Sequence, residues 1–262
     1  MGNAPQGKSK IAARHRHKIA RLRSQIARFE PVVETGPRAG TGFGEIDAYL
    51  TANAGGGLAV GGVHEITAAR PGDMSAALGF ADYLSQKFLA PIAEKTASSS
   101  CLLYGQTHAC VRENGQPYAT ALQHADRLVY LDGVSLPDLM WAGEEALGCA
   151  AIGCIILASL DEAPNFTFSR RLSMAARSVE RPLIMALGAA ASGTASAATS
   201  QWQVKAIANN GWHLRLTRLR ASYTQNPPHQ GWQVFPHAQP LPVASAPTAK
   251  PASARSPLRA LN

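Results

Sequence analysis

The sequence lacks the features of a membrane-anchored, secreted or metal-binding protein. No uninterrupted apolar run reaches the roughly 20 residues of a membrane-spanning helix. The basic N-terminus has no apolar stretch typical of a signal peptide. The four cysteines form no CxxC pair, and no histidine stands beside them at zinc-finger spacing: Cys101, Cys110, Cys149 and Cys154. We therefore expect a cytoplasmic protein with reduced, buried thiols and no metal, a redox or metal role being the less favoured alternative.

Acidic residues are missing from both ends of the chain. Residues 1–29 contain eight Lys or Arg and no acid, and residues 181–262 contain eight more without an acid. All 17 acids fall within residues 30–180, which have a net charge of −8. Such asymmetry favours contact of the ends with a polyanion or an acidic partner, the alternative being that the charge serves only solubility.

The length of 262 residues, 46% of them hydrophobic, predicts one large domain with tails. Strand-like and helix-like segments alternate through the middle of the chain, which favours a parallel α/β sheet flanked by helices. Strands are expected at 60–67, 101–104, 128–131, 153–157 and 183–187, and helices at 43–50, 73–89, 118–124, 136–147 and 168–179. The pattern then changes, because the three strands expected at 201–207, 212–219 and 231–235 have no helices between them. These predict an antiparallel C-terminal extension.

This pattern divides the chain into five segments. They are a basic amphipathic N-terminal helix (1–33), the α/β core (34–188), a flexible Ala/Ser/Gly loop (189–200), the antiparallel strand extension (201–235) and a disordered Pro/Ala-rich tail (236–262).

The N-terminal helix has an apolar stripe at helical spacing, formed by Ile19, Leu22, Ile26 and Phe29. Its other faces are basic, and the candidate DNA or partner contacts there are Arg14, Arg16, Lys18, Arg21 and Arg23. A helix that packs on the core with a solvated basic face explains the pattern equally well.

The loop expected between the first strand and the 73–89 helix stands where a phosphate loop, GxxxxGK[ST], would lie. The segment contains Ala68, Arg70, Gly72, Asp73, Met74 and Ser75, and of the defining positions only the last keeps its residue type. The second glycine is replaced by Asp73 and the lysine by Met74. A carboxylate about 4 Å from a phosphate would repel it by roughly 4 kcal/mol at an effective dielectric constant near 20. We therefore expect no useful triphosphate binding.

Several segments, taken in order, resemble the RecA/ImuA family. They are the run His64–Ile66, the run Cys101–Ala109, the stretch Arg127–Leu147, and the later segments around Trp202, Arg215–Arg220 and Trp232–Val234. The resemblance covers about residues 38–235. It implies a RecA-like core.

The same resemblance places the other ATPase positions. The family's catalytic Glu corresponds to Thr107, and its magnesium-binding Asp corresponds to Ala158. Asp161 lies three residues further along, a displacement of several ångströms in a strand. Phosphoryl transfer depends on positioning and charge stabilisation, so we expect no catalytic residues, no cofactor and no ATP hydrolysis.

The function implied by the resemblance is that of a non-catalytic accessory protein in damage-induced translesion DNA synthesis (SOS mutagenesis). Its expected partners are an ImuB-type Y-family polymerase homologue, an error-prone replicative-type DNA polymerase and RecA, with DNA as a further contact. A DNA-dependent ATPase or recombinase would need the missing phosphate loop. A DNA-binding regulator of recombination or of the SOS response, without ATPase activity, is the remaining alternative.

A second candidate contact surface lies near the C-terminus. Arg218 and Arg220 share one strand face, whereas Arg215 points to the other if no bulge intervenes. Trp202, Trp212 and Trp232 either belong to this interface or simply cover the sheet.

Overall fold

The computed structural model describes residues 36–95, 100–119, 122, 125–220 and 230–236. The expected N-terminal helix, with its five basic candidates, and the C-terminal tail beyond Pro236 lie outside these residues. None of the helices in the described part is long and apolar enough to cross a membrane. The elements, in chain order, are β1 (Arg38–Ala39), α2 (Gly44–Ala54), β2 (Leu58–Ala59), β3 (Gly62–Ala68), η1 (Pro71–Asp73), α3 (Met74–Lys95), β4 (Cys101–Thr107), α4 (His108–Asn114), η3 (Ala125–Arg127), β5 (Leu128–Val134), α5 (Leu136–Gly148), β6 (Ile152–Ser159), α6 (Phe166–Ser178), β7 (Pro182–Leu187), η4 (Ala189–Ala191), β8 (Ser200–Ile207), β9 (Gly211–Leu219) and β10 (Trp232–Val234).

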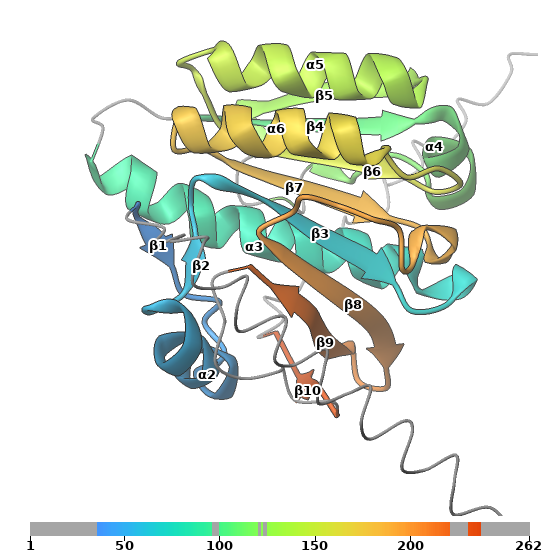
Figure 1. Cartoon of the computed structure of the whole chain (residues 1–262). Coiled ribbons are helices and arrows are strands. Elements are labelled where there is room, and N and C mark those ends of the chain that lie inside the picture. Colours follow the sequence, from blue (N-terminus) through green and yellow to red (C-terminus); the bar gives the residue numbers. More distant parts are fainter. Residues whose placement is uncertain (1–35, 96–99, 120–121, 123–124, 221–229, 237–262) are drawn as a thin grey trace, which may run out of the picture.

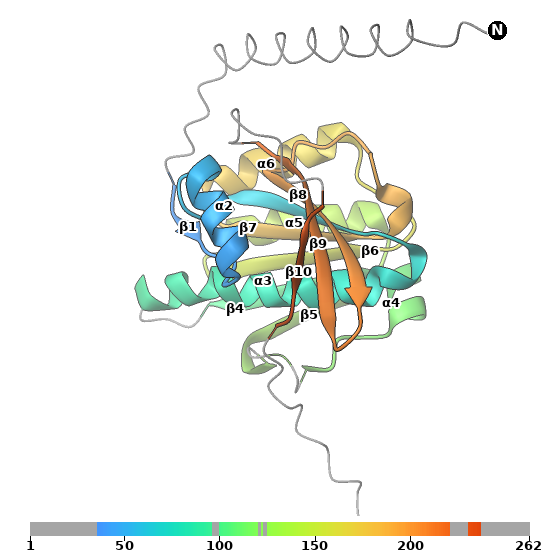
Figure 2. The same ribbon diagram turned by 90° about the horizontal axis from the view of Figure 1, so that it is seen from below.

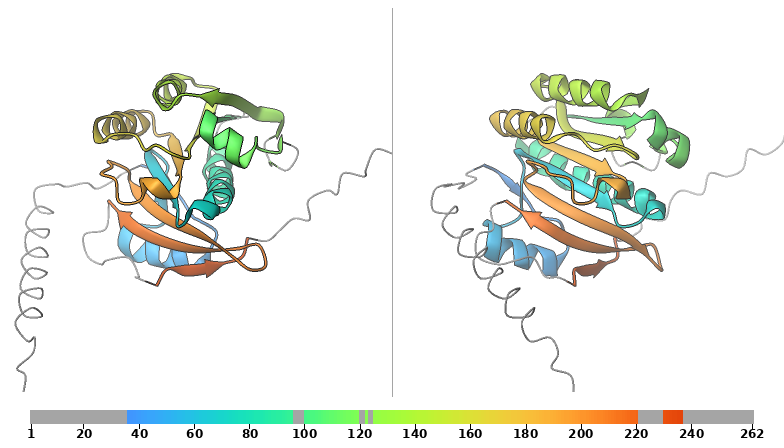
Figure 3. Two further views of the ribbon diagram at one scale, coloured as in Figure 1. Left: turned by 90° about the vertical axis from the view of Figure 1, so that its right-hand side faces the viewer. Right: turned by 45° about the vertical axis from the view of Figure 1, so that its right-hand side comes forward.

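One large sheet organises the molecule. Its strand order is β10-β9-β8-β3-β7-β6-β4-β5, and the six strands from β8 to β5 run parallel. Helices α5 and α6 lie over one face and α3 over the other (Figures 1 and 3). Every residue of β6 is buried, as expected for a strand covered on both faces. The predicted α/β class with a mostly parallel, helix-flanked sheet is therefore confirmed.

Local sequence fixes the starts of the two helices on the α6 side. Ser135 caps α5 by accepting a hydrogen bond from the Asp138 amide, and Pro137 stands in the first turn, where it leaves no intrahelical bond unmade. Asn165 caps α6 in the same way through the Phe168 amide. Both helices then bury one stripe against the sheet.

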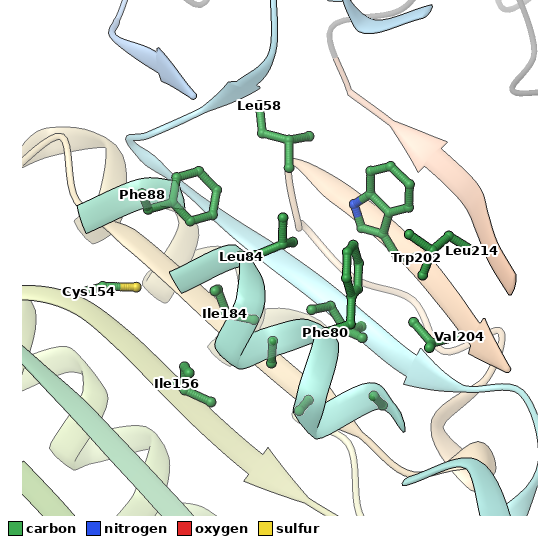
Figure 4. Close-up of a cluster of buried hydrophobic side chains, with 14 of the residues drawn as sticks. Leu58, Phe80, Leu84, Phe88, Cys154, Ile156, Ile184, Trp202, Val204 and Leu214 are labelled. Atoms are coloured by element: carbon green, nitrogen blue, oxygen red, sulfur yellow. The ribbon is translucent and has the colours of Figure 1, made fainter. Parts of the chain in front are cut away.

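The core on the α3 face is aromatic. Phe80, Leu84 and Phe88 of α3 point toward the sheet, and Figure 4 shows Trp202 of β8 facing Phe80. The rings of Phe80 and Trp202 are 5.8 Å apart in an edge-on arrangement. Trp212 packs against Phe80 at 5.6 Å, and Trp232 packs against Tyr49 of α2 at 5.6 Å. Trp202 and Trp232 are buried and Trp212 is partly buried against the same core, so these three tryptophans cover the sheet.

Some predicted elements differ from the structure. Of the helix expected at 118–124, the structure describes three residues: Tyr118 is not helical, Ala119 belongs to a 3-10 turn and Leu122 to a bend, so no α-helix is seen at these positions. The α-helix of this region is α4, which is capped at its C-terminus by Gly115 with φ +74°. Its seven residues are too few to show a helical period. Helix α3 runs on to Lys95, past the predicted end at Leu89.

The C-terminal strands also differ in part from the prediction. Strand β8 pairs with β3 in parallel, so it belongs to the parallel core, and only β9 and β10 add antiparallel strands. The chain reaches β8 from β7 by crossing β3 (Figure 2). The sequence pattern did not reveal this crossover, because it is short and contains no long helix.

The crossover itself departs from the expected flexible loop. Residues 196–200 are all buried, and Thr199 donates its amide hydrogen to the Val63 carbonyl at 2.8 Å. Small side chains at these positions let the backbone pack against the sheet and α6. The Ala/Ser composition therefore reflects close packing here.

Candidate functional site

The loop between β3 and α3 is closed by its own ion pair. Asp73 is 1% exposed, and its carboxylate accepts hydrogen bonds from Arg70 Nε at 3.0 Å and Nη2 at 3.1 Å. The same carboxylate accepts from the amide of Ala206 on β8 at 3.1 Å. The Arg70 hydrogen bond is the main cause that holds the pKa of Asp73 below its usual value, against the opposing effect of burial.

This pairing corrects the expectation that Asp73 would point at a phosphate. The carboxylate lies at the N-terminus of α3, where backbone N–H groups and the helix dipole stabilise an anion. The protein supplies that anion itself. Arg70 is paired with Asp73, although its side chain is 62% exposed.

Met74 and Ser75 complete the loop. Met74 is 1% exposed and belongs to the core on the α3 face, so the position of the missing lysine points into the hydrophobic interior. Ser75 is exposed, and its hydroxyl donates to Asn114 Oδ1 of α4 at 3.5 Å. Ala68 is fully buried at the end of β3, while a Cβ atom at Gly72 would have no neighbour within 4 Å. None of these residues forms an open cradle.

A small crevice lies where β4, β5 and β6 end, at the edge of a parallel sheet where ligands usually bind. Its volume is about 240 Å³, and its walls include Thr107, Ser135, Ser159, Asp161 and Glu162. Thr107 Oγ1 is buried without a hydrogen-bond partner among the described residues. Ala158 lies inside β6 and is fully buried, whereas Asp161 is exposed beyond the strand end and shares the crevice with Thr107.

A bulge in β9 decides where the C-terminal arginines lie. Gln201 pairs with Arg218 and Trp202 with Leu216, so Thr217 is an extra residue on β9. Leu214, Leu216 and Leu219 consequently all pack in the α3-face core. Arg215 and Arg218 therefore share the opposite face. The sequence placed Arg215 on the other side only if no bulge intervened, and this condition is not met.

The roles of the three arginines differ. Arg218 Nη1 donates to the Ser196 carbonyl at 2.7 Å, and Arg220 Nη1 donates to the Ala197 carbonyl at 3.5 Å, so both hold the crossover in place. Arg215 is exposed and has no hydrogen-bond partner in the described part of the chain. It borders a polar cavity of about 220 Å³ together with Glu65, Gln201, Gln203 and Thr217.

Glu65 is a functional candidate that sequence reasoning missed. Its side chain is 3% exposed and accepts hydrogen bonds from Ser196 Oγ and from Gln201 Nε2, the latter at 2.7 Å. Burial raises the pKa of this carboxyl, and the hydrogen bonds and Arg218 oppose the rise. A glutamate within a strand expected to lie inside the sheet was the available signal. Glu65 and Arg215 give this polar cavity one acidic and one basic side chain.

The cysteines are free, but their burial is mixed. Cys110 and Cys154 are buried, Cys101 is half-buried, and Cys149 is exposed after α5. The expectation of buried thiols is therefore wrong for Cys149, which lies in the turn between α5 and β6 where no element covers it. In the described part of the chain, no group of three or more His, Cys, Asp or Glu side chains is placed to hold a metal ion.

Fold and loop together define an α/β protein whose phosphate-loop position is filled by its own side chains. No family model matches the sequence, and no curated protein matches it either.

Proposed function

We propose that this protein is a non-catalytic, RecA-like accessory factor of damage-induced translesion DNA synthesis, of the ImuA type. The observation that carries the proposal is the self-paired loop before α3. The Arg70–Asp73 pair and the buried Met74 fill the position where a RecA-type ATPase would hold phosphate. A core with this loop acts by binding, and its surface has to provide the contacts.

The arrangement of the sheet supports the RecA-like part of this proposal. The degenerate loop follows β3, which lies inside the parallel sheet, and leads directly into the long helix α3. This is the strand–loop–helix context that a phosphate loop requires. The segments that carry the family resemblance fall in order on β3, β4, β5, α5, β8, β9 and β10.

The proposed partners are an ImuB-type Y-family polymerase homologue and an error-prone replicative-type polymerase, with RecA and DNA as further contacts. On the described surface, Arg215 and Arg218 together with Lys205 of β8 form a basic stretch on the α6 face of the sheet. Such a stretch suits nucleic-acid phosphates or an acidic protein surface.

The test is to delete the gene in its own cells and to measure damage-induced mutation frequency after ultraviolet irradiation. We expect the frequency to fall several-fold and to return with the wild-type gene. Affinity capture of tagged protein from irradiated cells should recover the two polymerase-type proteins. An unchanged mutation frequency in the deletion strain contradicts the proposal.

The alternative is a DNA-binding regulator of recombination or of the SOS response, favoured by the same basic stretch. This role predicts a different result in the deletion strain. Induction of damage-response genes would change, and no polymerase would be captured. Measuring transcript levels beside mutation frequency separates the two functions.

A further inference from the structure

A second cavity lies on the α3 face of the sheet, far along the strand order from β8 and β9. Helix α3 packs against β3, β6, β7 and β8, which leaves the α3 face of β4 and β5 to α4 and the segment after it. The space left between α3 and this segment is about 230 Å³. Its polar walls are formed by Asp82 of α3, Tyr104 and Gln106 of β4, and Asn114 and Gln116.

Asp82 is an acid without a counter-ion in this cavity. It is half-buried, and its carboxylate accepts a hydrogen bond from Gln86 Nε2 at 3.0 Å. No Lys, Arg or His of the described residues lines the cavity. Burial raises the pKa of Asp82 to about 6, against the effect of the Gln86 hydrogen bond. A carboxylate in such a place is stabilised by a cation that the described chain does not provide.

Each of the three amide groups around Asp82 already donates at least one hydrogen bond to another part of the chain. Gln106 Nε2 donates to the Gly115 carbonyl at 3.4 Å, and Asn114 Nδ2 donates to the Cys110 carbonyl at 3.2 Å. Gln116 Nε2 donates to Asp132 Oδ2 at 2.6 Å.

The group on this wall that most needs a partner is the Asp82 carboxylate, since it is the one charged side chain among the described lining residues. Gln106 Oε1 is taken by the Tyr130 hydroxyl at 2.8 Å. The Asp82 carboxylate and Gln116 Oε1 are left to accept hydrogen bonds from a ligand. Such a wall selects a group that donates several hydrogen bonds and carries positive charge.

The volume of the cavity and the residues at its rim restrict the class of ligand further. The cavity is smaller than the roughly 300–1,000 Å³ of typical small-molecule sites, and it is the right size for one long side chain. Tyr118, 60% exposed, and Pro117 stand at its rim. A tyrosine ring at this position can stack on a guanidinium or ammonium group.

We infer that this cavity is an acceptor site for one cationic side chain, an arginine or a lysine presented by a protein partner, with Asp82 as its counter-ion. A partner is the source because a single acid and one ring give a free amine little affinity. The remaining binding energy has to come from the surface around the side chain. This inference does not depend on the proposed function.

The test uses the full-length protein and N-acetyl-arginine methylamide as the probe. The uncharged N-acetyl-citrulline methylamide, which has nearly the same shape, is the control. Carbon-detected NMR follows the Asp82 carboxyl signal and the Tyr118 ring during titration. We expect the arginine probe to shift both signals with a millimolar Kd and the citrulline probe to leave them in place.

Variants identify the counter-ion. Asp82→Asn keeps the side-chain shape and an acceptor for Gln86, and it should abolish the shift of the Tyr118 ring. Asp161→Asn removes an exposed acid from the other crevice and should have no effect. Tyr118→Ala changes an exposed side chain, so folding is preserved, and it should weaken binding several-fold. Equal shifts with both probes, or unchanged binding to Asp82→Asn, overturn the inference.

Binding should also depend on pH. Below about pH 6 protonation of Asp82 removes the counter-ion, so affinity should fall by up to about tenfold for each pH unit. Tyr104, Tyr130, Cys110 and Cys154 are nearby, and burial raises the pKa of each, so all four stay uncharged in this range. Asp132 at the rim is the other acid that faces this wall, through Gln116. Affinity that is constant from pH 7 to pH 5 overturns the assignment to Asp82.

Discussion

At the scale of single residues, Asp73 and Met74 show how the loop before α3 is built into the core. They are adjacent and both almost fully buried, but their surroundings are opposite. Asp73 is held by Arg70 and by the Ala206 amide, whereas Met74 lies among apolar side chains. A lysine at position 74 would therefore bury a charge among apolar groups. The Asp73 carboxylate would still occupy the N-terminus of α3.

We predict that Met74→Lys destabilises the protein without creating ATP binding. An ammonium group in this environment has no partner, and the free energy of unfolding should fall by about 2 kcal/mol or more. Met74→Leu, which conserves volume, should cost less than about 1.5 kcal/mol. Urea denaturation measures both. A well-folded Met74→Lys protein that binds ATP would show that the loop is open.

His64 is the buried group that should make folding sensitive to acid. It is fully buried, with its ring nitrogens 2.8 Å from Ser200 Oγ and 2.9 Å from the Ala59 carbonyl oxygen, and it stacks on Phe88. Desolvation lowers its pKa from 6.5 to about 4, although the Ala59 hydrogen bond opposes the shift. The folded protein therefore holds this histidine neutral.

Between pH 6.5 and about pH 4 the unfolded chain binds a proton that the folded protein does not. The free energy of unfolding should fall across this window as the pH is lowered, by up to roughly 3 kcal/mol. Glu65 and Asp82, whose pKa values are raised by burial, act in the opposite direction and reduce the net change. Comparing wild type with His64→Gln isolates the histidine. Parallel stability curves for the two proteins in this range would contradict the assignment.

At the scale of elements, the bulge in β9 is the feature that builds the basic face. One extra residue, Thr217, brings Arg218 to the same side as Arg215 while Leu219 returns to the core. Arg218 and Arg220 anchor the crossover, so reversing their charges would disturb folding as well as binding. Arg215 offers the cleaner test of the surface.

We predict that Arg215→Glu weakens binding to single-stranded DNA and makes the remaining affinity less dependent on salt. Each phosphate contact that is lost lowers the slope of log K against log salt by about 0.7. Arg170→Glu changes the same charge at an exposed position on α6 and is the control. Fluorescence anisotropy at several salt concentrations measures both. If the two variants behave alike, Arg215 is not a specific contact.

At the scale of the whole molecule, charge is separated along the chain. The 17 acids all fall within residues 30–180, whereas both ends are basic. Within the described part, the basic residues of β8 and β9 and the acid-lined cavity at Asp82 lie at different ends of the strand order. The described part of the molecule therefore offers two chemically distinct surfaces.

We predict that the whole protein is indifferent to ATP. A ligand at 100 times its Kd stabilises a folded protein by about 2.7 kcal/mol, so even moderate binding would raise Tm visibly. Tm should be unchanged by millimolar ATP and magnesium, with or without DNA. A rise in Tm that disappears in Ser75→Ala would overturn this prediction and reopen an ATPase role.

The sequence by itself determined the order of the strands from β3 to β7 and of the helices α3, α5 and α6 between them. The apolar run at 153–157 is typical of a buried strand, and the helix expected at 136–147 agrees with α5. It also predicted that the loop would lack the groups that bind phosphate, since a missing lysine can be seen without a structure. Whether a segment forms a helix or a strand depends mainly on its local sequence.

Only the tertiary structure decided where the side chains of these elements meet. The ion pair of Asp73 with Arg70 depends on a loop conformation fixed partly by Ala206, more than 100 residues away. The parallel pairing of β8 with β3, the bulge at Thr217 and the cavity at Asp82 likewise depend on contacts between distant segments. The alternation of apolar and polar residues along a strand does not reveal such contacts. The same alternation fits different strand partners, and it does not show where a one-residue bulge will form.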